Sequence, residues 1–118
     1  MGNVKDALIE DTLRKLGIGA NFKSFNILIT CINLVSNDPD CLLGVTKTLY
    51  PVVGKMCGCT PGAVEHNIRA ASKRAWRLNK DGLSKIARYN LAGPPTASEF
   101  IDILSAYIAR QTPYADLK

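Results

Sequence analysis

The stretch VTKTLYPVVGKMCGCTPGAVEHNIRAASKRAWRL, residues 45–78, decides the fold. Proline is tolerated in the first turn of a helix, where its missing N–H had no partner, so Pro51 predicts a short helix over residues 51–57 with Tyr50 as its cap. Gly58 follows. A glycine after an apolar stretch can adopt the left-handed conformation that ends a helix and turns the chain sharply.

A second helix is predicted directly after this turn. Thr60 supplies a hydroxyl cap, and Pro61 follows at the first helical position. No proline or glycine occurs from Ala63 to Leu78, so the helix runs over residues 61–78. At about 1.5 Å per residue it is roughly 27 Å long, enough to cross a DNA groove. Gly54 is small where the two helices pass closely, and this spacing is typical of a helix-turn-helix.

The second helix has two different faces. Apolar residues recur at three- and four-residue spacing and predict a core-facing side. These residues are Val64, Ile68, Ala71, Ala75 and Leu78. The opposite side carries Glu65, His66, Arg69, Lys73, Arg74 and Arg77.

The rest of the chain predicts further helices. The first spans residues 4–16 and ends at Gly17, with Ile18 making an apolar contact behind it. The second, over residues 22–36, is apolar and is capped by Asn21.

Three more segments are predicted to be helical. Asp38 and Pro39 begin a short helix, residues 79–82 form a turn, and residues 83–89 form another short helix. Thr96 and Glu99 form a capping box before the last helix, which Thr112 and Pro113 end. We therefore predict one all-α domain over residues 1–118, with five to six helices and a helix-turn-helix inside it.

Composition favours a globular chain with a polyanionic partner. The chain is 47% hydrophobic and 21% charged, as in ordinary globular domains. Fifteen Lys and Arg against ten Asp and Glu give a net charge of +5 and a pI near 9.2. Six basic residues against one acidic residue occur in residues 73–88. Such a basic stripe is the footprint of nucleic acid, with a solvated helix face as the alternative.

Metal, membrane and catalytic functions are not favoured by the sequence. The four cysteines form no CxxC pair, and His66 is the one histidine in the chain. We therefore expect no metal and no cofactor, and interpret Cys57 and Cys59 as small apolar filler at the turn. The longest apolar run, residues 27–35, is far shorter than the roughly 20 residues of a membrane span, so we expect a cytoplasmic chain. No nucleophile motif, phosphate loop or facing pair of carboxylates suggests an enzyme.

The polar face of the second helix supplies the candidate binding residues. Arg69 suits a guanine edge, because a guanidinium can form a bidentate pair there. His66 can donate to a base or phosphate, or be a surface histidine without a role. Glu65 can accept a hydrogen bond from cytosine, orient Arg69 one turn away, or simply lie in the first turn of the helix, where the helix dipole favours a carboxylate. Candidate phosphate contacts, which position the protein without reading sequence, are Lys47, Thr60, Lys73, Arg74 and Arg77.

The central stretch closely resembles the DNA-binding effector domain of the stage-zero sporulation response regulator A family. The likeness lies first in a T-K-x-L-Y-P segment, residues 46–51, and in a V-E-x-x-I-R-x-A-x-x-x-A-W pattern, residues 64–76. It extends to the Leu16-Gly17-Ile18 helix end and to residues 98–101, and so covers nearly the whole chain.

The resemblance implies an all-α domain that binds double-stranded promoter DNA at short boxes and places the second helix in the major groove. It also implies pairing of copies on adjacent boxes and contact with the polymerase sigma subunit. Glu65 and Arg69 match base-contacting positions of the family. Ala63, His66 and Ala70 depart from it, since they stand where a family member carries arginine, arginine and histidine.

Two further expectations follow from the resemblance. The family's regulator has a phosphorylated receiver domain, which the 118 residues do not contain, so we expect a single effector domain. The departures at Ala63, His66 and Ala70 motivate a rival hypothesis, in which the chain is a helical protein-interaction module that has lost specific DNA reading.

Overall fold

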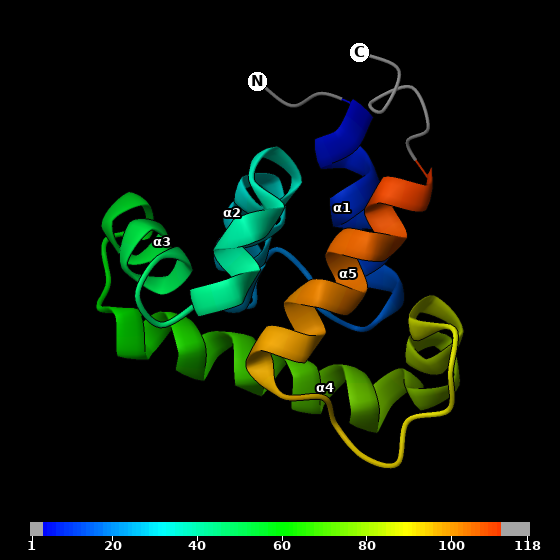
Figure 1. Ribbon diagram of the computed structural model, residues 1–118. Helices are drawn as coiled ribbons and strands as arrows, with labels where there is room; N and C mark the ends of the chain where they lie inside the picture. Colours follow the sequence, from blue (N-terminus) through cyan, green and yellow to red (C-terminus); the bar gives the residue numbers. More distant parts are fainter. Residues whose placement is uncertain (1–3, 112–118) are drawn as a thin grey trace.

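The computed structural model describes residues 4–111 (Figure 1). Helices alone make up the regular structure in that range, which confirms the predicted all-α class. The elements are α1 (Val4–Lys15), α2 (Ser24–Asn37), the 3₁₀ helix η1 (Pro39–Gly44), α3 (Leu49–Cys57), α4 (Pro61–Ala87) and α5 (Ala97–Gln111).

The longest helix, α4, lies along one side of the molecule, and α2 and α5 pack across it (Figure 1). Apolar side chains from these three helices meet in the core, where Leu28, Ile68, Phe100 and Leu104 are fully buried. The start of α1 and the end of α5 lie on the side away from α4. The core therefore holds α4 by one face and leaves its other face towards solvent.

The predicted helix ends at glycines are confirmed. Gly17 has a φ of 88°, and the Ile18 N–H donates to the Leu13 carbonyl oxygen at 2.9 Å behind it. This bond closes the end of α1, and Ile18 is fully buried as expected. Gly58 has a φ of 73° and ends α3 in the same way.

The predicted capping box before α5 is also confirmed. The Thr96 N–H donates to Glu99 Oε1 at 2.9 Å, and the Glu99 N–H donates to Thr96 Oγ1 at 3.2 Å. Two N–H groups of the first turn thus gain partners, which fixes where α5 begins.

Two predicted caps are wrong, and the third, Asp38 before Pro39, is correct in position only. Asn21 does not cap α2, which begins at Ser24 after a turn in which the Phe22 N–H donates to the Gly19 carbonyl oxygen. Tyr50 is inside α3 and buried, because that helix begins two residues before Pro51. Asp38 makes no side-chain cap bond, and its carbonyl accepts from the Cys41 N–H instead. The segment that follows is therefore a 3₁₀ turn.

The second half of α4 also differs from expectation. Asn79 has non-helical angles, φ −154° and ψ 61°, but the helix resumes directly after it and ends at Ala87. The predicted turn over residues 79–82 is thus a break of one residue. Leu78, predicted to face the core, is 51% exposed and lies directly before the break. Thr112 and Pro113 lie outside the described residues.

Candidate nucleic-acid interface

The corner between α3 and α4 is set by backbone contacts. The Cys59 N–H donates to the Gly54 carbonyl oxygen at 2.8 Å. A Cβ at position 54 would lie 2.5 Å from the Cys59 carbonyl oxygen, so the expected close approach at Gly54 is confirmed. Thr60 Oγ1 accepts from the Ala63 N–H at 3.0 Å, and Pro61 occupies the first turn. The predicted Thr60 cap therefore starts α4 where sequence reasoning placed it.

Side chains of other helices fix the direction of α4. Ser24 Oγ of α2 donates to the Asn67 carbonyl oxygen at 2.6 Å. Ser72 is fully buried, and its hydroxyl donates to the Pro95 carbonyl oxygen at 2.7 Å. Sequence reasoning missed both serines, because a single buried serine in a helix leaves no periodic signal. Together they hold the buried face of α4 against α2 and the segment before α5.

Glu65 and Arg69 form an ion pair on the exposed face of α4. Arg69 Nε lies 3.1 Å from Glu65 Oε2, and Nη2 lies 2.9 Å from Oε1. The Arg69 side chain is 44% exposed and the Glu65 side chain is 37% exposed. The hydrogen bond to Arg69 holds the pKa of Glu65 below its usual value, since the bond favours the ionised carboxyl. The sequence left three roles open for Glu65, and in this structure it orients Arg69.

Most of the other candidate contacts are exposed, and four of them belong to α4 or its cap. His66, Lys73 and Arg77 lie on the solvent side of α4, Thr60 is exposed at its start, and Lys47 is exposed in the turn before α3. The arrangement places a carboxylate, an imidazole and several cations along one helix, with Lys47 separate from them in the chain.

Arg74 differs from its neighbours. It is half-buried, and its Nε donates to the Gly17 carbonyl oxygen at 2.7 Å. Its guanidinium carbon lies 5.1 Å from the centre of the Phe22 ring. The sequence grouped Arg74 with the exposed cations because its partners lie more than fifty residues away in the chain.

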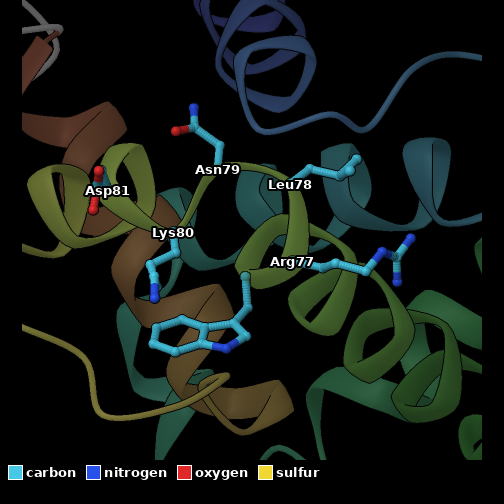
Figure 2. Close-up of a pocket in the computed structure, with 6 residues that line it drawn as sticks. Arg77, Leu78, Asn79, Lys80 and Asp81 are labelled. Atoms are coloured by element: carbon cyan, nitrogen blue, oxygen red, sulfur yellow. The ribbon is translucent and has the colours of Figure 1, made fainter.

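The break in α4 is organised by the Asn79 side chain. Its Oδ1 accepts from the Gly82 N–H at 3.0 Å, which caps the second half of the helix, and its Nδ2 donates to the Lys15 carbonyl oxygen at 3.0 Å. Figure 2 shows the Asn79 and Lys80 side chains pointing in opposite directions. Both residues line a shallow hollow of about 430 Å³. Lys80 lies 5.5 Å from the centre of the Trp76 ring, which is half-buried.

The cysteines are free thiols. Cys31 is buried, and burial raises its pKa well above the ordinary value, so the thiol stays protonated. Cys57 and Cys59 are half-buried and pack against the core at the turn. Within residues 4–111 no group of three metal-ligating side chains comes together. The described helices include none that is long and apolar enough to cross a membrane.

An exposed, cation-rich helix that follows a tight two-helix corner defines the class of helix-turn-helix DNA-binding domains. The comparison with protein families agrees with this class. The family described as "Sporulation initiation factor Spo0A C terminal" matches residues 9–108 of the 118-residue chain. The chain belongs to this family, which consists of DNA-binding domains of sporulation transcription regulators rather than enzymes.

Proposed function

We propose that this chain is a sequence-specific double-stranded DNA-binding domain whose recognition helix, residues 61–78, enters the major groove. The Glu65–Arg69 pair is the observation that carries this proposal. Glu65 occupies the edge of the guanidinium formed by Nε and Nη2. The edge formed by Nη1 and Nη2 stays available, and it has the spacing that suits O6 and N7 of guanine. Arg69 is therefore oriented for a base before DNA arrives.

The base-reading set is Glu65, His66 and Arg69. Glu65 has capacity beyond its two bonds to Arg69, since a carboxylate has about four acceptor positions, and one of these suits a cytosine amino group. His66 is exposed one residue further along the helix and suits a base edge or a phosphate. Ala63 and Ala70, which flank this set, offer methyl groups alone, so thymine methyls are the contacts available to them.

The phosphate-contacting set is Lys47, Thr60, Lys73 and Arg77, with Arg74 as a member to be tested. Lys73 and Arg77 are exposed one turn apart on α4. The Thr60 hydroxyl accepts a backbone bond and keeps its own hydrogen for a phosphate. Neutralising about six phosphates would give a slope near −5 for log affinity against log salt.

The proposal is tested by selecting bound sequences from a random duplex library and measuring the affinity for the recovered sequence and for a scrambled duplex across salt concentrations. Arg69→Ala is expected to weaken binding to the recovered sequence by about 1–3 kcal/mol and to affect the scrambled duplex less. Lys73→Ala is the matched control, with equal losses on both duplexes. If Arg69→Ala, like Lys73→Ala, weakened binding to both duplexes equally, Arg69 would be removed from the base-reading set.

The alternative is a helical protein-interaction module without specific DNA reading. The small side chains of Ala63 and Ala70 favour it, because they leave few polar groups beside Arg69. The selection would then recover no sequence, and binding to any duplex would be weak. We further propose that the 118 residues act as one effector domain in the cytoplasm. In this role copies pair on tandem sites, and the domain contacts the polymerase sigma subunit.

A further inference from the structure

The end of α1 presents backbone carbonyls towards α4. The last carbonyls of a helix have no partner within the helix and must be satisfied from outside. The Arg14 and Leu13 carbonyls accept from the Gly17 and Ile18 N–H groups. The Lys15 and Gly17 carbonyls are bound by α4, through Asn79 Nδ2 at 3.0 Å and Arg74 Nε at 2.7 Å. We name residues 15–18 the α1 corner.

The α1 corner also touches α4 without polar groups. A Cβ at Gly17 would lie 2.6 Å from Leu78 Cδ1, so the glycine backbone is in close contact with this side chain. Leu78 is the last residue before the break at Asn79. The corner therefore contacts α4 at three positions within six residues, all at the far end of the recognition segment.

Arg74 is fixed in this contact from two sides. The Phe22 ring lies against its guanidinium, and the Gly17 carbonyl accepts its Nε hydrogen. Its positive charge also lies at the carbonyl end of α1, where the helix dipole favours a cation. Lys73 and Arg77, by contrast, are exposed. Because a ring and a carbonyl hold its guanidinium, Arg74 connects α4 to the segment that follows α1 and thereby orients α4.

The distance along α4 between Arg74 and the base-reading residues makes this contact important for base reading. Arg74 lies nine residues after Glu65, roughly 13 Å along the helix axis at 1.5 Å per residue. A tilt of about 5° at Arg74 would displace Glu65 by roughly 1 Å, more than a hydrogen bond tolerates. Small changes at the α1 corner are thus amplified at the reading residues.

We propose that Arg74 is a positioning residue for DNA reading, which sets the angle of the recognition helix through Gly17 and Phe22 and makes no required phosphate contact. This inference rests on the proposed function, since it concerns how the same helix reads DNA. It separates Arg74 from the phosphate-contacting set.

The test compares Arg74→Ala, Arg74→Lys and Phe22→Leu with Lys73→Ala as the matched control, on the recovered and scrambled duplexes at several salt concentrations. Circular dichroism first confirms that each variant is folded. Arg74→Lys keeps the charge but loses the planar group that fits against Phe22. Phe22→Leu changes no charge at all, so an effect of this variant on reading cannot come from a phosphate.

All three test variants are expected to lower the preference for the recovered duplex by about fivefold to tenfold and to retain the salt slope, because none of them removes a required phosphate contact. Lys73→Ala is expected to keep the preference and to reduce the slope by about 1. Full rescue by Arg74→Lys, together with a slope reduced by about 1 in Arg74→Ala, would identify a phosphate contact and overturn the inference. Unchanged preference in all three variants would overturn it too. Wild-type protein without any preferred duplex would instead overturn the proposed function, before the variants are compared.

Discussion

Of the helix ends in this domain that adopt the left-handed conformation, those of α3 and α4 use different residues. Gly58 ends α3 with a φ of 73°, and Arg88 ends α4 with a φ of 71°. An L residue with a side chain is disfavoured in this region by roughly 1–2 kcal/mol, because its Cβ approaches the following carbonyl oxygen, whereas glycine is not. The first end is therefore free of strain and the second is strained.

The surroundings of the two ends explain why they differ. Gly58 belongs to the corner that sets the start of α4, where the backbone of α3 at Gly54 touches the backbone of the turn at Cys59. Arg88 lies on the surface beyond the last turn of α4, where its N–H donates to the Ser84 carbonyl oxygen at 2.8 Å. Strain at the first corner would shift the start of α4, whereas strain at the second affects a connecting segment.

The contact at Gly54 is the strongest test of this difference. Gly54→Ala is expected to destabilise the fold by about 2–3 kcal/mol, because the new methyl group would overlap the Cys59 carbonyl oxygen. Gly62→Ala is the matched control on α4, where the nearest atom, Thr60 Oγ1, is 3.9 Å from the added Cβ. It is expected to stabilise by about 0.5–1 kcal/mol through helix propensity. Urea unfolding measures both, and equal effects would refute the close contact.

The second prediction concerns conformation without a clash. No atom lies within 4 Å of a Cβ added at Gly58, so Gly58→Ala introduces only the left-handed strain. We expect a loss of about 1 kcal/mol in the free energy of unfolding. Gly58→Asn is the control, since asparagine tolerates this conformation better, and should lose less. An alanine variant as stable as wild type would show that the corner adopts another conformation.

The sequence predicted these local features well because each depends on neighbouring residues. The left-handed glycines, the Thr60 cap and the capping box at Thr96 are all confirmed. The exposed positions of Glu65 and Arg69 follow from helical periodicity alone. The family resemblance is confirmed as well.

The contacts that sequence reasoning missed are those between distant residues. From its sequence position Arg74 resembles an ordinary surface cation, and only the fold brings Gly17 and Phe22 to it. Ser72 finds the Pro95 carbonyl twenty-three residues away. Leu78 fits the apolar period but precedes a break that depends on the Lys15 carbonyl. Such partners depend on packing, which a single sequence does not encode locally.

The third prediction is a gain in the free energy of unfolding at the other helix end, where Arg88 is strained. Arg88→Gly is expected to stabilise the domain by about 0.5 kcal/mol, because relief of left-handed strain exceeds the entropy that glycine adds to the unfolded chain. Arg88→Ala removes the same charge but keeps the Cβ, and should give no gain. Urea unfolding of the two variants checks this difference. A stabilised alanine variant would attribute the gain to charge and remove the argument from strain.

The last prediction concerns Tyr50, which is 5% exposed in the first turn of α3. Burial, with the nearby Glu65 carboxylate adding to it, raises the pKa of Tyr50 from 10.0 to about 12. The folded state thus binds the phenol proton more tightly than the unfolded state. The stabilisation from this group is complete below the unfolded pKa and is lost as pH rises towards the folded one.

Tyr50→Phe removes that titration while keeping the ring. Between about pH 9 and pH 11, wild type is expected to lose more unfolding free energy than Tyr50→Phe, because the lysines that titrate there are common to both proteins. Denaturant unfolding at a series of pH values measures this difference. Parallel curves would mean that the hydroxyl reaches solvent in the folded state.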